Sequence, residues 1–167
     1  MNYAKIKPVD IANGLGVRVS LFVSGCSHHC KGCFNAELWN YEAGEEFTLD
    51  TVQEIIELYC NKPYITGLSL LGGEPLDARN LKGVTTLAAI FKKKFPNKDI
   101  WCYTGYRFED VAHFQIMKYL DVVVDGQFVE VLKSPKLRFR GSSNQRIIDV
   151  KKSLDSQLIV LRKDLME

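Results

Sequence analysis

The sequence predicts a single α/β domain over residues 1–167, with a parallel sheet that is either open or curled into an incomplete barrel. Two observations support this fold class. Short apolar runs that end in glycine and polar residues alternate with segments of helical spacing, which is the pattern of parallel strands joined by right-handed crossovers. The 167 residues, 46% of them hydrophobic, suffice for one core. They do not reach the roughly 250 residues of a full eightfold barrel.

The first strand and the first helix have clear signals. Residues 17–23 are apolar and rich in β-forming residues, and they end at a Ser-Gly pair, so they predict a buried strand that leads into a group of cysteines. Residues 48–60 carry apolar side chains at helical spacing, with Thr48 or Asp50 as a suitable N-cap.

The alternation continues to about residue 131, and the pattern is weaker beyond it. Glycine and polar residues follow each apolar run, while lysines and a proline close the second helix. The remaining predicted elements are a strand over 67–71, a helix over 81–95, a strand over 100–103, a helix over 108–117, and strands over 119–124, 145–150 and 157–161.

Composition narrows the class of protein. The chain has 22 Lys and Arg against 20 Asp and Glu, so its formal charge of +2 gives no reason to expect a nucleic-acid partner. It has no signal-like segment at the N-terminus and no run of eighteen apolar residues, so we expect a cytoplasmic protein without a membrane span. Five cysteines, three of them within eight residues, indicate metal ligation in a reducing compartment.

The cysteine group has the spacing C-x3-C-x2-C, formed by Cys26, Cys30 and Cys33. Three thiolates on one short loop suit an iron–sulfur cluster and leave one of four irons open to a ligand. A zinc site completed by His28 or His29, or a chance grouping, are the alternatives. Isolated Cys60 and Cys102 are expected to be small buried hydrophobic residues.

Three more loops follow predicted strands and should open on the same face as the cysteines. Paired glycines allow backbone carbonyls to approach a ligand. An acidic group at a strand end can accept hydrogen bonds from a ribose. Ordinary tight turns are the alternative. The candidate ligand-binding residues are Gly72, Gly73, Glu74, Pro75, Thr104, Gly105, Tyr106 and Asp125.

Over about residues 9–130 the sequence resembles the radical S-adenosylmethionine activases of glycyl radical enzymes. The resemblance rests on residues 13–18, on the run from Phe22 through Cys33 to the Phe34-Asn35 pair, and on the later Gly-Gly-Glu-Pro and Tyr-Thr-Gly-Tyr stretches. Within that family it is most similar to the branch that activates anaerobic ribonucleoside-triphosphate reductase. Asn13-Gly14-Leu15-Gly16 stands where the family usually has Asp-Gly-Pro-Gly.

The resemblance implies a chemistry and a set of partners. It implies an incomplete barrel of the radical S-adenosylmethionine type. Cys26, Cys30 and Cys33 would hold a 4Fe-4S cluster whose open iron binds S-adenosylmethionine, with residues 72–75 near the methionine amino group. Reductive cleavage would give a 5′-deoxyadenosyl radical, which removes hydrogen from a glycine of the reductase. A low-potential donor such as flavodoxin would supply the electron.

Several features stay open at this stage. His28 and His29 either shield a cluster and help to dock a partner, or are polar loop residues. Arg18 either pairs with a carboxylate or caps its strand. The basic segment over 133–140 is either a docking surface or a solvated loop. Rival functions are a radical enzyme acting on another glycyl radical enzyme or on a small molecule and, from a different class, a zinc-binding or electron-transfer module.

Overall fold

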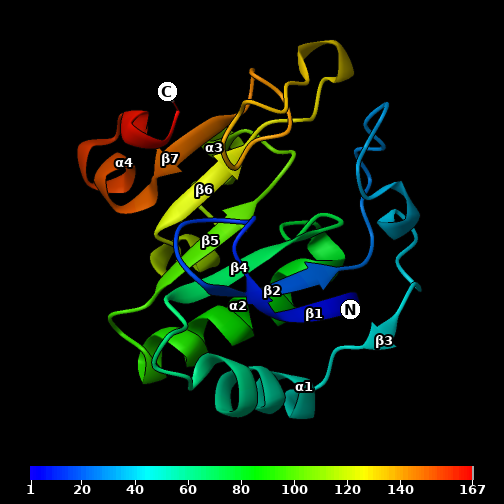
Figure 1. Ribbon diagram of the computed structural model, residues 1–167, viewed down its shortest axis with the longest axis vertical. Helices are drawn as coiled ribbons and strands as arrows, with labels where there is room; N and C mark the ends of the chain where they lie inside the picture. Colours follow the sequence, from blue (N-terminus) through cyan, green and yellow to red (C-terminus); the bar gives the residue numbers. More distant parts are fainter. Residues whose placement is uncertain (167) are drawn as a thin grey trace.

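The computed structural model describes residues 1–166, and its centre is one mixed sheet of seven strands (Figure 1). Along the sheet the order is β3-β1-β2-β4-β5-β6-β7, so β3 and β7 are its edges. The strands are β1 (Asn2–Asp10), β2 (Arg18–Val23), β3 (Glu45–Glu46), β4 (Gly67–Gly72), β5 (Asp99–Tyr103), β6 (Val122–Asp125) and β7 (Arg146–Asp149).

The predicted parallel alternation is confirmed in the middle of the sheet, where β2, β4, β5 and β6 pair in parallel. The strands outside this centre correct the prediction, because β1 and β7 pair antiparallel with β2 and β6. β1 was not predicted, because lysines interrupt its apolar residues. In the structure its register with β2 shifts twice. β7 follows β6 without a crossover helix, so the chain returns antiparallel.

Helices occupy most of the predicted positions, but several boundaries differ. The helix predicted over 48–60 is α1 (Leu49–Glu54) continued by the π-helical η2 (Ile55–Cys60), and Thr48 caps it through a reciprocal bond with Thr51. α2 (Ala78–Lys94) starts three residues early because the Asp77 side chain accepts from the Arg79 N–H. None of the helices in residues 1–166 is long and apolar enough to cross a membrane.

The later part of the chain departs further from the predictions. The helix expected over 108–117 is split into α3 (Phe108–Val111) and the 3-10 turn η3 (Gln115–Lys118). The strand expected over 157–161 is wrong, because only an isolated bridge joins Leu161 to Ile148. Besides β1 and β3, the elements that the sequence pattern missed are α4 (Val150–Ser156) and the 3-10 turns η1 (Ala36–Leu38), η4 (Glu130–Leu132) and η5 (Lys163–Leu165).

The two faces of the sheet have different roles. On one face, alternate strand residues such as Leu21, Leu70 and Cys102 join the main core with α1, η2 and α2, which lie along that side (Figure 1). Cys60 and Cys102 are fully buried in this core, as expected for small hydrophobic residues. The other face carries Phe22 and Tyr103 and leaves room for a cavity at the carboxyl ends of the parallel strands.

Candidate functional site

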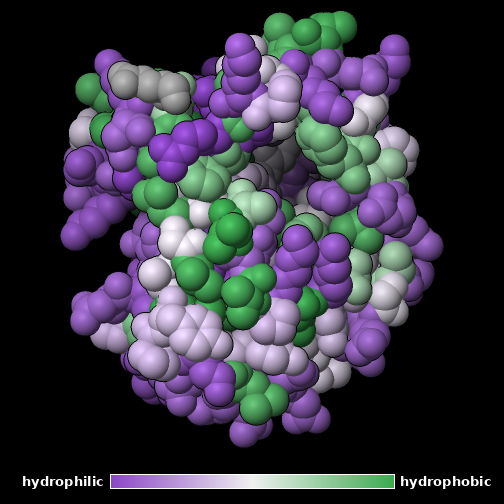
Figure 2. All heavy atoms as spheres, in the orientation of Figure 1, coloured by the Kyte–Doolittle hydropathy of each residue, from purple (hydrophilic) through white to green (hydrophobic). Residues whose placement is uncertain are grey.

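A cavity of about 650 Å³ lies against the face of the sheet opposite α1 and α2. Figure 2 shows the hollow in this side of the molecule. Its wall combines strand residues from β1, β2, β4 and β5 with the loop after β2 and the segment after β6. The predicted site residues that line it are Cys26, Cys30, Cys33, Gly72, Gly73, Glu74, Thr104 and Gly105.

The cysteine loop begins where β2 ends, and close backbone packing holds its first residues. Gly25 has φ +93°, and a Cβ there would overlap the ring of Tyr41, so this position requires glycine. Its carbonyl accepts the Glu74 N–H at 2.8 Å. Because β2 and β4 are neighbours in register, with Val23 opposite Gly72, the cysteine loop and the Gly72-Gly73 turn start side by side.

All three cysteines of the loop are free thiols, partly exposed to the cavity. Burial raises the pKa of Cys26 to about 11, and the nearby charge of Glu74 adds to this, while the N–H groups of His28 and His29 oppose it. Burial also raises the pKa of Cys30. The Asn35 N–H lies 3.4 Å from Cys33 Sγ. Such N–H donors are typical around ligating sulfurs, and bound metal would keep the thiols deprotonated, so the donor set fits an iron–sulfur cluster.

The two histidines of the loop have structural partners. His28 Nε2 lies 2.9 Å from Glu74 Oε2, and its Nδ1 lies 3.1 Å from the side-chain amide of Gln127. A donating Nε2–H and an accepting Nδ1 satisfy both contacts. The His29 ring stacks on Trp39 with centroids 4.5 Å apart. Within residues 1–166, no three His, Cys, Asp or Glu side chains are arranged to hold a single metal ion.

The Glu74 carboxylate ties three loops together at the cavity wall. It is 1% exposed and accepts hydrogen bonds from the Leu76 N–H, the Thr104 hydroxyl and the Gly105 N–H, at 2.7 to 2.9 Å, besides its contact with His28. We call this set the Glu74 clamp. Four donors from the ends of β2, β4 and β5 saturate one buried carboxylate, so the loops that line the cavity hold one another in place.

A second carboxylate, Asp77, links the cysteine loop to α2. Its Oδ2 accepts from the Tyr41 hydroxyl at 2.7 Å and from the Ser27 hydroxyl at 3.3 Å, while Oδ1 caps α2. Desolvation and this carboxylate raise the pKa of Tyr41 to about 12. Buried Asn80, in the first turn of α2, donates to the carbonyls of Ser24 and Glu74. The start of α2 therefore anchors both loops.

Three predicted site residues, Pro75, Tyr106 and Asp125, are not part of the cavity lining. Tyr106 instead packs edge-on against His28, with ring centroids 4.6 Å apart. Asp125 is 1% exposed, and its carboxylate accepts from the Phe108 N–H and from the Arg146 guanidinium. It holds the start of α3 and β7.

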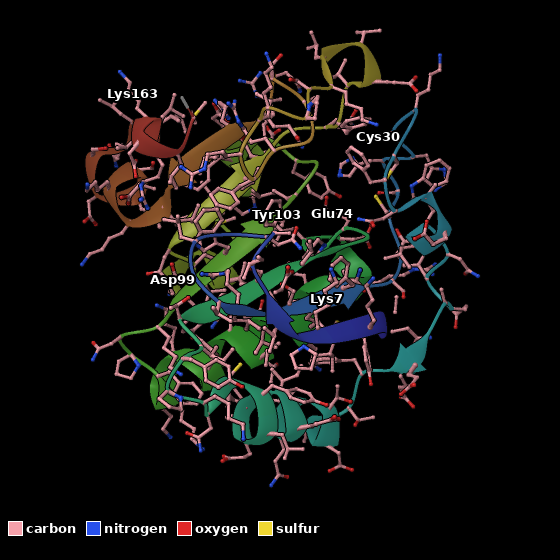
Figure 3. The ribbon with its side chains drawn as sticks, viewed as in Figure 1. Lys7, Cys30, Glu74, Asp99, Tyr103 and Lys163 are labelled. Carbon is pink, nitrogen blue, oxygen red and sulfur yellow. The ribbon has the colours of Figure 1, made fainter. Side chains whose placement is uncertain are left out.

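Several residues that line the cavity were not among the predicted site residues. Lys5 and Lys7 reach the cavity from β1 and lie over the Phe22 ring, 4.8 and 5.5 Å from its centroid. Tyr103 comes from the end of β5, and Arg140 from the segment after η4. Figure 3 shows Cys30, Glu74 and Tyr103 around the same space. The sequence signal for Lys5 and Lys7 is their spacing of two residues, which places both on the same face of a strand. A search for continuous apolar runs does not detect this spacing.

Arg18 lies on the cavity-bearing face of the sheet, at the amino ends of the parallel strands and away from the cysteines. Its side chain is fully buried and pairs with Asp99 at 2.6 Å, which settles the open question in favour of a carboxylate partner. It also donates to the Ser69 hydroxyl at 2.7 Å and lies over the Trp101 ring. The ion pair, with its added hydrogen bonds, fills the space near the amino ends of β2 and β5.

Comparison with known proteins gives a consistent picture. Residues 12–148 match the family model described as "4Fe-4S single cluster domain". The anaerobic ribonucleoside-triphosphate reductase-activating protein of Enterobacteria phage T4 is 47% identical over 88% of this chain and 93% of its own length. Proteins of the same name from Escherichia coli K12 and Vibrio cholerae are 43% and 42% identical, over 87% and 88% of this chain and 96% and 97% of theirs. The chain therefore belongs to the 4Fe-4S single cluster domain family and, within it, to the anaerobic ribonucleoside-triphosphate reductase-activating proteins.

Proposed function

We propose that this protein activates an anaerobic ribonucleoside-triphosphate reductase by cleaving S-adenosylmethionine reductively and generating a glycyl radical on the reductase. One observation carries the proposal. The three free cysteines of the C-x3-C-x2-C loop line the same cavity as the Gly72-Gly73 and Thr104-Gly105 strand ends. Thiolates for a cluster and backbone groups for a polar ligand therefore share one space.

The residues present suit both cofactors. Cys26, Cys30 and Cys33 would hold a 4Fe-4S cluster with one iron free of protein ligands. The cavity of about 650 Å³ is in the size range of sites for ligands such as S-adenosylmethionine. Carbonyls of Gly72 and Gly73 would accept from its amino group, because neither residue has a side chain in the way. When bound, the reduced cluster and S-adenosylmethionine would supply a 5′-deoxyadenosyl radical that removes hydrogen from a glycine Cα.

The protein's own part in this function is positional. The Glu74 clamp and Asp77 keep the cysteine loop against the ends of β4 and β5. Lys5, Lys7 and Arg140 place positive charge on the cavity wall, where a carboxylate of the ligand could pair with them. We further propose that the sheet, which contributes lining residues from β1, β2, β4 and β5, acts as an incomplete barrel wall whose open side admits a loop of the reductase.

The test is a reconstitution under anaerobic conditions. The proposal expects about four irons per chain, formation of 5′-deoxyadenosine on reduction, and a glycyl radical signal in electron paramagnetic resonance when the reductase is added. A colourless protein with one zinc ion would contradict it. If 5′-deoxyadenosine forms but an authentic reductase gains no radical, the protein acts instead on another glycyl radical enzyme or on a small molecule.

The supply of electrons belongs to the same proposal. We expect a low-potential donor such as flavodoxin, in the cytoplasm, to reduce the cluster. Replacing a chemical reductant with reduced flavodoxin should sustain 5′-deoxyadenosine formation, measured by chromatography. No product with flavodoxin, alongside full product with dithionite, would exclude that donor.

A further inference from the structure

A surface beside the mouth of the cavity has the composition of a docking site. It joins two segments, residues 31–34 of the cysteine loop and residues 128–136 around η4. We define this rim patch as Lys31, Phe34, Val131, Leu132, Lys133 and Lys136. Hydrophobic atoms gather at the top of the molecule in Figure 2, where Figure 1 places η4, and side-chain contacts between Phe34 and Phe128 and between Lys31 and Glu130 join η4 to the cysteine loop.

The apolar members of the rim patch are unusually exposed. Val131 is 89% exposed, Phe34 59% and Leu132 41%. They are held in position, because the Phe34 ring packs on Phe128 with centroids 5.1 Å apart and the Leu132 N–H donates to the Val129 carbonyl. Exposed apolar side chains on an ordered turn next to a binding cavity are typical of protein interaction sites.

Lysines outnumber acidic side chains in and around the rim patch, so its net charge is positive. Lys31 and Glu130 approach to 3.7 Å, and Lys133 Nζ lies 4.6 Å from the centre of the Phe34 ring. Residues 31–34 and 128–141 together hold five cationic side chains and one carboxylate, in a chain whose formal charge is only +2. These two segments therefore carry a formal charge of +4, five cations less one carboxylate, which exceeds the +2 of the whole chain and would attract an acidic partner.

We propose that the rim patch docks the reductase itself, through a surface that presents acidic side chains around an apolar one. This inference rests on the proposed function, because a protein substrate must bring a backbone Cα into the cavity. Lys133, Ser134 and Pro135 line the cavity and continue directly from η4. Any polypeptide that enters the cavity from this side contacts the rim patch first.

The test uses the double variant Val131→Asp/Lys136→Glu, since neither residue lines the cavity and both are exposed. Binding of the reductase to the reconstituted protein is measured by titration, and 5′-deoxyadenosine formation without reductase is measured with dithionite. We expect at least a tenfold weaker affinity for the reductase and cleavage within twofold of the unmodified protein. The matched control is Leu49→Asp/Lys93→Glu, which alters exposed residues on α1 and α2 and should leave both readings unchanged.

One outcome would overturn this docking proposal, namely a reductase affinity of the double variant that is less than tenfold weaker than that of the unmodified protein. If cleavage supported by flavodoxin is slower in that case, the rim patch belongs to the electron donor instead. Thermal unfolding of both double variants shows whether they remain folded, as expected for surface substitutions. Binding is measured apart from chemistry, so a failure of the radical mechanism would appear separately, as missing 5′-deoxyadenosine in the unmodified protein.

Discussion

Two buried carboxylates at the ends of parallel strands, Glu74 after β4 and Asp125 on β6, have similar settings but opposite roles. Each is 1% exposed and saturated by donors. Glu74 receives its donors from the cysteine loop and from the loops after β4 and β5, all at the cavity wall. Asp125 receives them from the start of α3 and from Arg146 on β7, outside the cavity lining. Glu74 therefore links loops that line the cavity, whereas Asp125 links elements that lie outside its lining.

The largest effect is expected at the cysteine loop, which contacts Glu74 and not Asp125. Replacing any of Cys26, Cys30 or Cys33 with Ala should abolish 5′-deoxyadenosine formation, because two thiolates do not hold the cluster with one open iron. Cys60→Ala is the control; it should cost about 1 kcal/mol of stability and retain activity. Full cleavage by any variant of the first set would refute the ligand assignment.

The next effect should come from Glu74→Gln. An amide places a donor where the carboxylate accepts from four groups, so the clamp loses at least one hydrogen bond and its charge. We expect a loss of about 2 to 3 kcal/mol in unfolding free energy, and less iron retained per chain after reconstitution. Denaturant unfolding and iron analysis measure the two. Unchanged iron retention would mean that the clamp does not position the cysteine loop.

Asp125→Asn should separate stability from function. Arg146 keeps its contacts with Glu109 at 2.7 and 3.1 Å, so the cost should be about 2 kcal/mol rather than that of an unpaired buried charge. Iron content and cleavage by the refolded protein should stay near those of the unmodified chain. A selective fall in affinity for S-adenosylmethionine, with stability intact, would instead identify Asp125 as a ligand contact.

The smallest effect concerns pH at the Asp125 end. Arg146 lowers the pKa of Glu109 from 4.5 to about 2, so ionised Glu109 stabilises the fold above pH 4.5 and this contribution disappears as pH falls to 2. The Glu109 side chain is 46% exposed, which limits the effect to about 0.5 kcal/mol. Glu109→Gln should be that much less stable at pH 6 and equal to the unmodified chain near pH 2. An equal difference at both pH values would exclude the ion pair as its source.

The same comparison shows how far sequence reasoning reached. The cysteine loop, the Gly72-Gly73 turn and the parallel centre of the sheet follow from local patterns, and the structure brings them together. Asp125 satisfied the same strand-end rule as Glu74, but its partner Arg146 lies 21 residues away, so no local pattern separates the two roles. Lys5 and Lys7 were missed because lysines interrupt the apolar residues of β1, so its sequence does not form an apolar run.

Arg18 has a consequence for where a ligand can lie on this face of the sheet. Together with Asp99 and Trp101 it fills the end of the face that lies away from the cysteines, and none of these three residues lines the cavity. A ligand in the cavity is therefore confined to the half of the face that holds the carboxyl ends of β2, β4 and β5 and the cysteine loop.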